Sequence, residues 1–261
     1  MKKQKLAVVF AALLTMVGFS SCLNSGDDNL NYPSFQLPVT IAGDALGGYT
    51  FWSDYGNIKL RPTSASVSQL KLDGVKRAVI AFDLTEEQAG ITQLEPNKVY
   101  TVVVNPAYCY GIPTYSMAVD TLSVQYQENG NDSIALKCKP ITSVNTTAGA
   151  FYVKNGYMTF IPTFSYGNAP VYFGLYYDRE KDVNAEAGSL KMNLYFNNSL
   201  ENSTASSGTS SISLKMPSDL YMEYAQKDSI DLILNFKSSS STQSPLKCKM
   251  AVSDFMLPYG Y

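Results

Sequence analysis

The chain has 261 residues, of which 45% are hydrophobic, 12% aromatic and only 16% charged, and its formal charge at pH 7 is −2. It contains no histidine, which excludes Ser-His-Asp and Cys-His catalysis and any zinc site with a histidine ligand. The acidic balance and the lack of a basic tract argue against nucleic acid as a partner.

The N-terminus predicts a lipoprotein signal peptide over residues 1–21. Three lysines lie among the first five residues, and an uncharged apolar segment follows from Leu6 to Val17. A helix that spans the hydrocarbon core needs about 20 residues, so this shorter segment fits the apolar region of a signal peptide. Small residues then lead to Cys22 in a pattern that resembles the lipobox of bacterial lipoproteins, with Phe19 in place of the usual leucine. The resemblance implies cleavage before Cys22, acylation of its thiol by a fatty acid such as palmitate, and anchoring in the membrane through the N-terminal lipid.

Residues 22–34 are predicted to form an acidic, flexible tether. Asp27 and Asp28 follow Cys22 within a polar segment, and an acidic cluster at this place is similar to the surface-export signal of Bacteroidota lipoproteins. We therefore expect an outer-membrane lipoprotein of the cell envelope, and exposure at the cell surface stays open.

Beyond the tether, apolar residues alternate with a period of two, which predicts strands. The clearest hairpin is Phe151–Ile161, where Asn155-Gly156 supplies the turn. A second hairpin is predicted from Thr121–Tyr126 and Ser133–Cys138, and a short helix over Thr85–Leu94, because Thr85 can cap it and two acids follow. Further strands are predicted at Val99–Val104, Val171–Tyr177, Leu190–Phe196, Ile212–Met216, Ile230–Phe236 and Cys248–Phe255.

Two domains are expected, residues 35–118 and residues 119–261. The first carries the only tryptophan and the predicted helix, and the second carries the longer alternating strands. Many short strands with regular turn signals predict an all-β protein built as sandwiches or barrels.

Several landmarks follow one another along the chain: the lipobox, Trp52–Asn57, Leu60–Thr63, Arg77–Leu84, Val99–Asn105, Phe151–Phe160 and Val171–Asp178. This arrangement resembles the NigD-like lipoproteins of Bacteroidota. The resemblance implies an N-terminal OB-like barrel followed by a C-terminal β-sandwich, after a cleaved lipoprotein signal peptide. It also implies a role as a bacteriocin immunity protein, which was proposed for the family, whereas the function of most members is unknown.

No residue is predicted to be catalytic or to bind a metal or cofactor, so we expect a protein that is not an enzyme. Glu86 and Glu87 do not predict a glycosidase pair, because adjacent side chains on a helix point in different directions and acids in a first turn favour the helix dipole. Asp44 and Asp54 are likewise not predicted to form a glycosidase pair. The acidic residues form no spaced calcium loop.

Three cysteines follow Cys22, an odd number for an exported protein. Cys138 and Cys248 both stand in Leu-Lys-Cys-Lys and could pair if their Cα atoms lay about 4.4–6.8 Å apart. The alternative is that all three are free cysteines that act as small apolar residues.

Three aromatic residues are candidates for stacking on a ligand such as a sugar ring: Trp52, Tyr176 and Tyr177. OB folds can bind oligosaccharides, and an aromatic ring offers an apolar face with a polar edge. Tyrosine is also simply a favourable strand residue.

Three Asp-Ser/Thr-aliphatic tripeptides resemble O-glycosylation acceptors of exported Bacteroidota proteins. Their hydroxyl residues are Thr121, Ser133 and Ser229. Aspartate at a strand start is also an ordinary turn residue.

Together these observations predict a lipid-anchored envelope protein that works as a binding or interaction module on an unknown protein or glycan. An accessory lipoprotein that binds glycans or captures nutrients, and a component of a surface appendage, are the alternatives.

Overall fold

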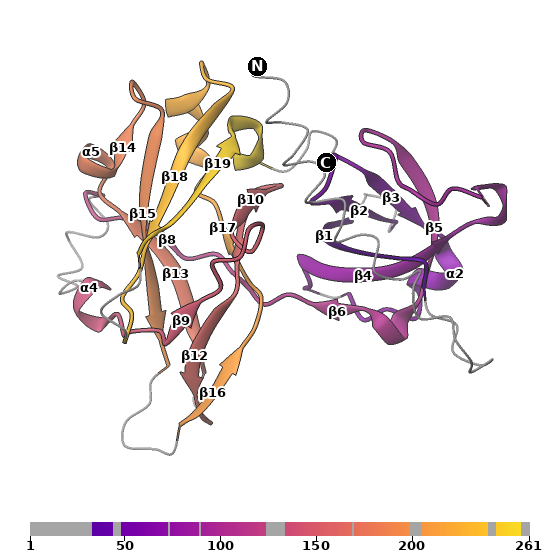
Figure 1. The fold of residues 1–261 in the computed structure, drawn as a ribbon, viewed down its shortest axis with the longest axis horizontal. Coiled ribbons are helices and arrows are strands. Elements are labelled where there is room, and N and C mark those ends of the chain that lie inside the picture. Colours follow the sequence, from indigo (N-terminus) through magenta and orange to yellow (C-terminus); the bar gives the residue numbers. More distant parts are fainter. Residues whose placement is uncertain are drawn as a thin grey trace. The chain divides into compact units, whose positions relative to one another are not determined.

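The structure is a computed structural model that describes residues 33–43, 48–72, 74–88, 90–123, 134–168, 170–198, 205–239 and 244–256. It is built mainly of strands, which confirms the all-β class. The chain divides into two compact units, with the boundary between Ile112 and Pro113 (Figure 1). We call them the barrel unit and the sandwich unit. The boundary precedes residue 118 because β7 and β8 pair with strands of the sandwich unit.

The barrel unit is closed. In the described part of the chain its strands follow the order β1-β2-β3-β5-β4, and β1 also pairs with β4. β3 and β5 are parallel, and the other neighbours are antiparallel. This is the predicted OB-like barrel. Its elements are β1 (Phe35–Gly43), β2 (Tyr49–Ser53), β3 (Lys59–Pro62), α2 (Ser64–Val67), β4 (Arg77–Leu84), η1 (Glu86–Gln88), β5 (Val99–Val104), η2 (Pro106–Tyr108) and β6 (Tyr110–Gly111).

The alternation of apolar residues directs side chains into the barrel. On β5, Tyr100, Val102 and Val104 are buried, while the residues between them are exposed. The helix predicted over Thr85–Leu94 is wrong, because only the single 3-10 turn η1 forms there. Gly90 has a φ of +94°, in the left-handed region that ends helical structure.

The sandwich unit packs two main sheets against each other. In the described residues, one sheet has the order β19-β18-β15-β13-β8, with β14 beside β15, and the other has the order β10-β11-β17-β7. A smaller sheet, β16-β12-β9, begins directly after β11. The elements of the whole sandwich unit are β7 (Thr114–Tyr115), β8 (Ala118–Asp120), α4 (Ile134–Lys137), β9 (Ser143–Val144), β10 (Tyr152–Lys154), β11 (Tyr157–Phe160), β12 (Pro162–Tyr166), β13 (Tyr172–Tyr177), α5 (Arg179–Asp182), β14 (Val183–Asn184), β15 (Ser189–Asn197), β16 (Ser206–Thr209), β17 (Ile212–Lys215), η3 (Ser218–Tyr224), β18 (Ser229–Asn235), β19 (Leu246–Ala251) and η4 (Val252–Phe255).

An aromatic cluster lies at the centre of the sandwich core. The Phe173 ring contacts the rings of Phe160, Phe164 and Phe196, with centroids 6.3, 5.2 and 5.0 Å away. These rings come from β11, β12, β13 and β15, so they join the sheets across the core. Such ring pairs stabilise a core beyond the apolar area that they bury.

One predicted hairpin is confirmed and the other is wrong. β10 and β11 pair around Asn155 (φ +52°) and Gly156 (φ +81°), as an Asn-Gly type I′ turn requires. By contrast, Ile134–Lys137 is a helical turn rather than a strand. The chain also leaves β8 at Asp120, whose carboxylate accepts a hydrogen bond from the Leu122 backbone N–H and so closes a local turn.

Within the described residues, none of the helices has the length and apolarity needed to cross a bilayer.

Candidate functional site

A buried ion pair organises the turn after β2. The Arg77 guanidinium, which is 0% exposed, binds both carboxylate oxygens of Asp54 at 2.5 Å and donates to the Thr40 hydroxyl at 2.7 Å. Asp54 therefore points inward, and Gly56 and Asn57 (φ +61° and +52°) complete the turn. This pair explains physically why the chain carries an aspartate directly after β2 and an arginine at the start of β4.

Trp52 lies beside Asp54 in sequence but on the outside of the barrel, since Ser53 and Phe51 on either side are buried. Lys59 is its cross-strand partner on β3. The Lys59 ammonium stands 4.8 Å from the centroid of the Trp52 ring, a cation–π contact that holds the indole in place.

Apolar residues of β5 extend this outer surface. Lys59 pairs with Val99, and Arg61 pairs with Thr101, so these side chains share one face of the sheet. Val99 and Val103 are 48% and 44% exposed. We call the set formed by Trp52, Lys59, Arg61, Val99 and Val103 the barrel face. It combines an aromatic ring, two cations and exposed valines, and of these residue types tryptophan and arginine are enriched at protein interfaces.

A hollow of about 600 Å³ adjoins the barrel face. Arg61 belongs to both, and the remaining walls come from the start of β2 and from α2. The hollow mixes tyrosine, hydroxyl and aliphatic side chains, so it suits a polar side chain of a partner. Its described lining is Gly48, Tyr49, Thr50, Arg61, Pro62, Ser64, Val67, Ser68 and Leu70.

The three candidate stacking residues come from two different units of the chain. Trp52 is on β2 of the barrel unit, whereas Tyr176 and Tyr177 are neighbours on β13 of the sandwich unit and point to opposite faces. Tyr176 is partly exposed, but Tyr177 is only 3% exposed and packs in the core. The prediction that Tyr177 stacks on a ligand is therefore wrong.

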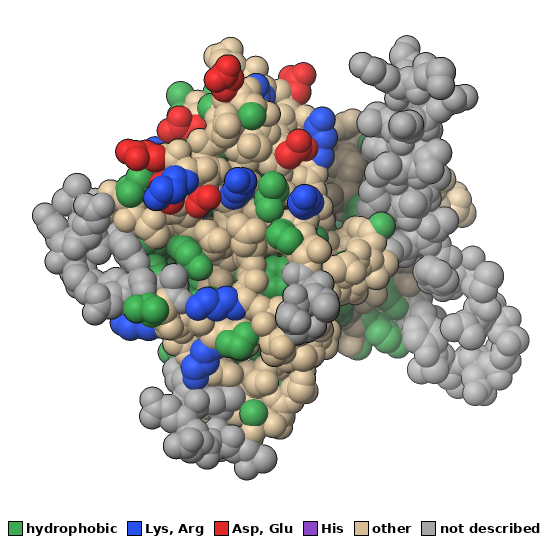
Figure 2. All heavy atoms as spheres, turned by 60° about the vertical axis from the view of Figure 1, so that its left-hand side comes forward, with side chains coloured by type: hydrophobic (Ala, Val, Ile, Leu, Met, Phe, Trp, Pro, Cys, Tyr) green, Lys and Arg blue, Asp and Glu red, His purple; other side chains and the backbone are tan. Residues whose placement is uncertain are grey.

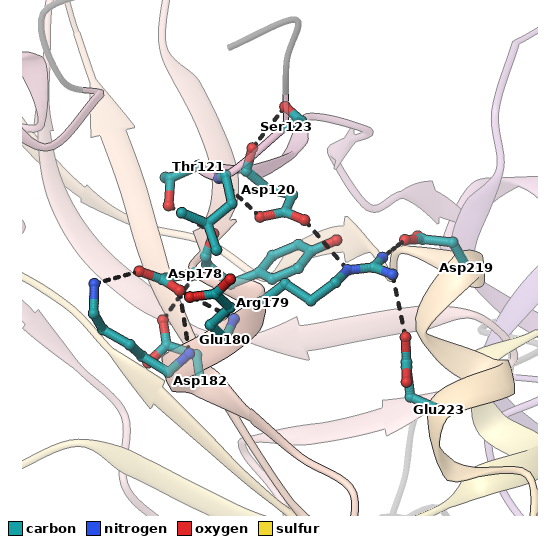
Figure 3. Close-up of polar contacts among 12 residues, drawn as sticks. Asp120, Thr121, Ser123, Asp178, Arg179, Glu180, Asp182, Asp219 and Glu223 are labelled. Atoms are coloured by element: carbon teal, nitrogen blue, oxygen red, sulfur yellow. Dashed lines mark hydrogen bonds and ion pairs between the residues drawn. The ribbon is translucent and has the colours of Figure 1, made fainter. Parts of the chain in front are cut away.

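A charged cluster surrounds Arg179 at one end of the sandwich unit (Figure 3). The guanidinium pairs with Asp120 (Nε–Oδ2, 3.2 Å), with Glu223 (Nη1–Oε1, 3.2 Å) and with Asp219. The Asp120 approach is an ion pair whose angle does not suit a hydrogen bond. A hydrogen bond with Tyr177 raises the pKa of Arg179 further. The arginine thus fastens β8 and η3 to the start of α5, a structural role.

The alternation of apolar residues did not predict this cluster, because the cluster depends on which distant strands pair. β8 and β13 run parallel with Asp120 beside Tyr177, so the residues that follow Tyr177 lie near Asp120. Asp178 caps α5 by accepting from the N–H groups of Glu180 and Lys181, and the hydrogen bond from Lys181 lowers its pKa. Across the described residues, no three acidic or cysteine side chains are grouped so that they could hold a metal ion.

The structure has the second of the two alternatives for the cysteines, in which none forms a disulfide: Cys109, Cys138 and Cys248 are all free. The Cys138 thiol donates to the Leu194 carbonyl oxygen at 3.3 Å. Burial raises the pKa of the Cys248 thiol to about 12, which makes this cysteine unreactive near neutral pH.

The candidate modification sites lie at different places. The Thr121 hydroxyl donates to the Tyr177 carbonyl oxygen at 3.1 Å, and Ser229 opens β18 opposite Ala251. Ser133 and Cys22 lie outside the described residues.

Comparisons with known proteins give a fold and no family. No protein-family model and no curated protein matches the chain. A solved structure from Parabacteroides distasonis, of a protein whose name calls it toxin-related, is similar over 84% of this chain and 94% of its own, with 15% identity and a TM-score of 0.55. A Bacteroides vulgatus protein of unknown function, DUF1344, is similar over 83% of this chain and 89% of its own, with 14% identity and a TM-score of 0.51. The chain thus shares its fold with uncharacterised proteins of these bacteria.

Proposed function

We propose that this protein is a lipid-anchored binding module of the cell envelope that engages a partner protein through the barrel face, and that it is not an enzyme. The observation that carries the proposal is the Trp52–Lys59 stack beside exposed valines. Tryptophan and arginine are the residues that most often dominate binding energy at protein interfaces. The two cations favour a partner with an acidic patch.

Immunity against a bacteriocin is the specific role that we propose, with the protein occluding a toxin at the envelope. Support comes from the resemblance to NigD-like lipoproteins and from the fold shared with a protein whose name calls it toxin-related.

The test is a deletion strain challenged with bacteriocin-containing supernatants of related strains. We expect deletion to sensitise the cells and the wild-type gene to restore resistance. A Trp52→Ala, Arg61→Ala variant should fail to restore it, whereas Glu86→Ala, an exposed change on η1 of the same unit, should restore it fully. Equal resistance with and without the gene would contradict the immunity role, and full rescue by the double variant would contradict the barrel face.

The anchor has its own test. A Cys22→Ala variant should lose incorporation of labelled palmitate and should leave the membrane fraction. Protease shaving of intact cells then separates a surface location, where the protein is lost, from a periplasmic one, where it is protected.

A further inference from the structure

We propose that the outer face of the β19-β18-β15-β13-β8 sheet is a second binding site, for an acidic polysaccharide. This inference goes beyond the proposed function and concerns a different unit of the chain. It rests on three groups of outward side chains: tyrosines, carboxamides and lysines.

The tyrosines come from two paired strands. On β13 the outward residues are Tyr172 and Tyr176, because Phe173, Leu175 and Tyr177 point into the core. Tyr172 is 51% exposed. Since a strand advances about 3.3 Å per residue, the two tyrosine positions are roughly 13 Å apart along β13.

A third tyrosine lies between these two on the neighbouring strand. Tyr195 of β15 stands opposite Gly174, which has no side chain of its own. The Met117 side chain packs against Gly174 so closely that a Cβ there would collide with it. Together these residues place three tyrosines on one face of the sheet, with the Met117 side chain over Gly174 between them, and aromatic rings suit the apolar faces of successive sugar rings.

Carboxamides alternate with the tyrosines. Asn197 is opposite Tyr172, and Asn193 is opposite Tyr176. Asn193 accepts a hydrogen bond from Asn235 of β18 at 3.3 Å and donates to the Tyr176 carbonyl oxygen at 3.4 Å. An amide has two donors and two acceptor lone pairs, so these contacts orient Asn193 and Asn235 and leave capacity for sugar hydroxyls.

Lysines supply the charge. Lys191 and Lys247 flank Ile233 in one cross-strand row, and Lys249 is beside Asp231 in the next. All three lysines are exposed, and among the described residues none of them is part of an ion pair. Figure 2 shows basic side chains both among the acidic ones in the upper part of the view and, without acidic neighbours, in its lower part.

The charge of this sheet face indicates which kind of ligand it binds. Tyrosines and lysines spread over several neighbouring strands suit an extended polymer, and lysines attract carboxylate, sulfate or phosphate groups. The whole chain is slightly acidic, so binding of a polyanion depends on this face rather than on net charge. An anionic lipid surface would use the lysines and the tyrosines, which are common at membrane interfaces, but would leave the asparagine row without a role.

The test is isothermal titration of the full-length protein in detergent at low salt, with polygalacturonate and dextran sulfate as anionic probes and dextran as the neutral probe. We expect both polyanions to bind and dextran to bind at least about tenfold more weakly. Tyr172→Ala and Lys191→Gln should each weaken polyanion binding by about three- to tenfold. The matched controls are Tyr110→Ala, an exposed tyrosine of β6, and Lys215→Gln, an exposed lysine of β17; neither should change it.

Two outcomes would overturn the proposal. One is failure of both polyanions to bind; the other is equal binding by wild type and the two face variants. Binding to phosphatidylglycerol vesicles in place of polysaccharide would replace it with a lipid-surface role. The only tryptophan, Trp52, lies on the barrel face, so its fluorescence should stay unchanged on polysaccharide binding, and failure of this inference is distinguishable from failure of the proposed function.

Discussion

The two units of this chain use arginine in opposite ways. In the barrel unit, Arg77 is fully buried and shares two short hydrogen bonds with Asp54. In the sandwich unit, Arg179 stands partly exposed among three carboxylates. Because water screens charges at a surface but not in a core, we expect the loss of Arg77 alone to destabilise its unit far more than the loss of Arg179.

The largest expected effect comes from breaking the buried pair. Arg77→Met should lower the free energy of unfolding of the barrel unit by about 3–5 kcal/mol, because it leaves the Asp54 carboxylate buried without a partner. Urea unfolding followed by Trp52 fluorescence measures this unit. Adding Asp54→Leu should recover much of the loss, and a single Arg77→Met variant as stable as wild type would contradict the assignment.

A turn substitution should have an intermediate effect. Gly156→Ala places a side chain at φ +81° in the β10–β11 hairpin and should cost about 1–2 kcal/mol, since L-residues avoid this region. Gly111→Ala in β6 is the control, because a Cβ there meets only ordinary contacts. Circular dichroism melting would show the difference, and equal melting temperatures would count against the turn geometry.

Removing the surface arginine should matter less. We expect Arg179→Gln to lower stability by at most about 1 kcal/mol, and high salt to shrink the difference. We expect Arg179→Ala to lower stability by a similar amount. A loss as large as that of Arg77→Met would show that the Arg179 cluster is far better shielded from water than its exposure indicates.

The smallest effect at neutral pH is expected from Tyr224, whose contribution to stability changes only in alkaline solution. Burial raises the pKa of Tyr224 to about 12, above its ordinary value of about 10. The unfolded chain therefore ionises first, so the stabilising contribution is complete below pH 10 and is lost as pH rises toward 12. Tyr224→Phe should flatten the alkaline fall in melting temperature of the sandwich unit, and an unchanged slope would refute this cause.

Much of the fold could be predicted from local sequence patterns, whereas the rest depends on which distant strands pair. The alternation along β5, β15 and β18 and the Asn155-Gly156 turn could be predicted because each depends on neighbouring residues. The Asp54–Arg77 pair and the tyrosine–asparagine rows could not, because each depends on which distant strands pair. The error at Ile134–Lys137 has a different cause, since a segment of four residues is too short for its pattern to distinguish a strand from one helical turn.

The candidate site residues could likewise be predicted only in part. Trp52 could be predicted as an exposed aromatic residue, but Tyr177 could not be predicted as buried, since adjacent residues of a strand differ only in the face that they occupy. Which face is inward depends on the sheet packed beneath it.

The strand pairings also set an order for folding. All strands of the barrel are complete once the chain has reached Gly111. The sandwich cannot close so early, because Ser189 of β15 pairs with Asp231 of β18, which pairs in turn with β19 near the C-terminus. A chain delivered from its N-terminus therefore gains a finished barrel while its sandwich strands still expose apolar faces. A stop codon after residue 228 should leave the barrel folded and the sandwich open to aggregation and proteolysis.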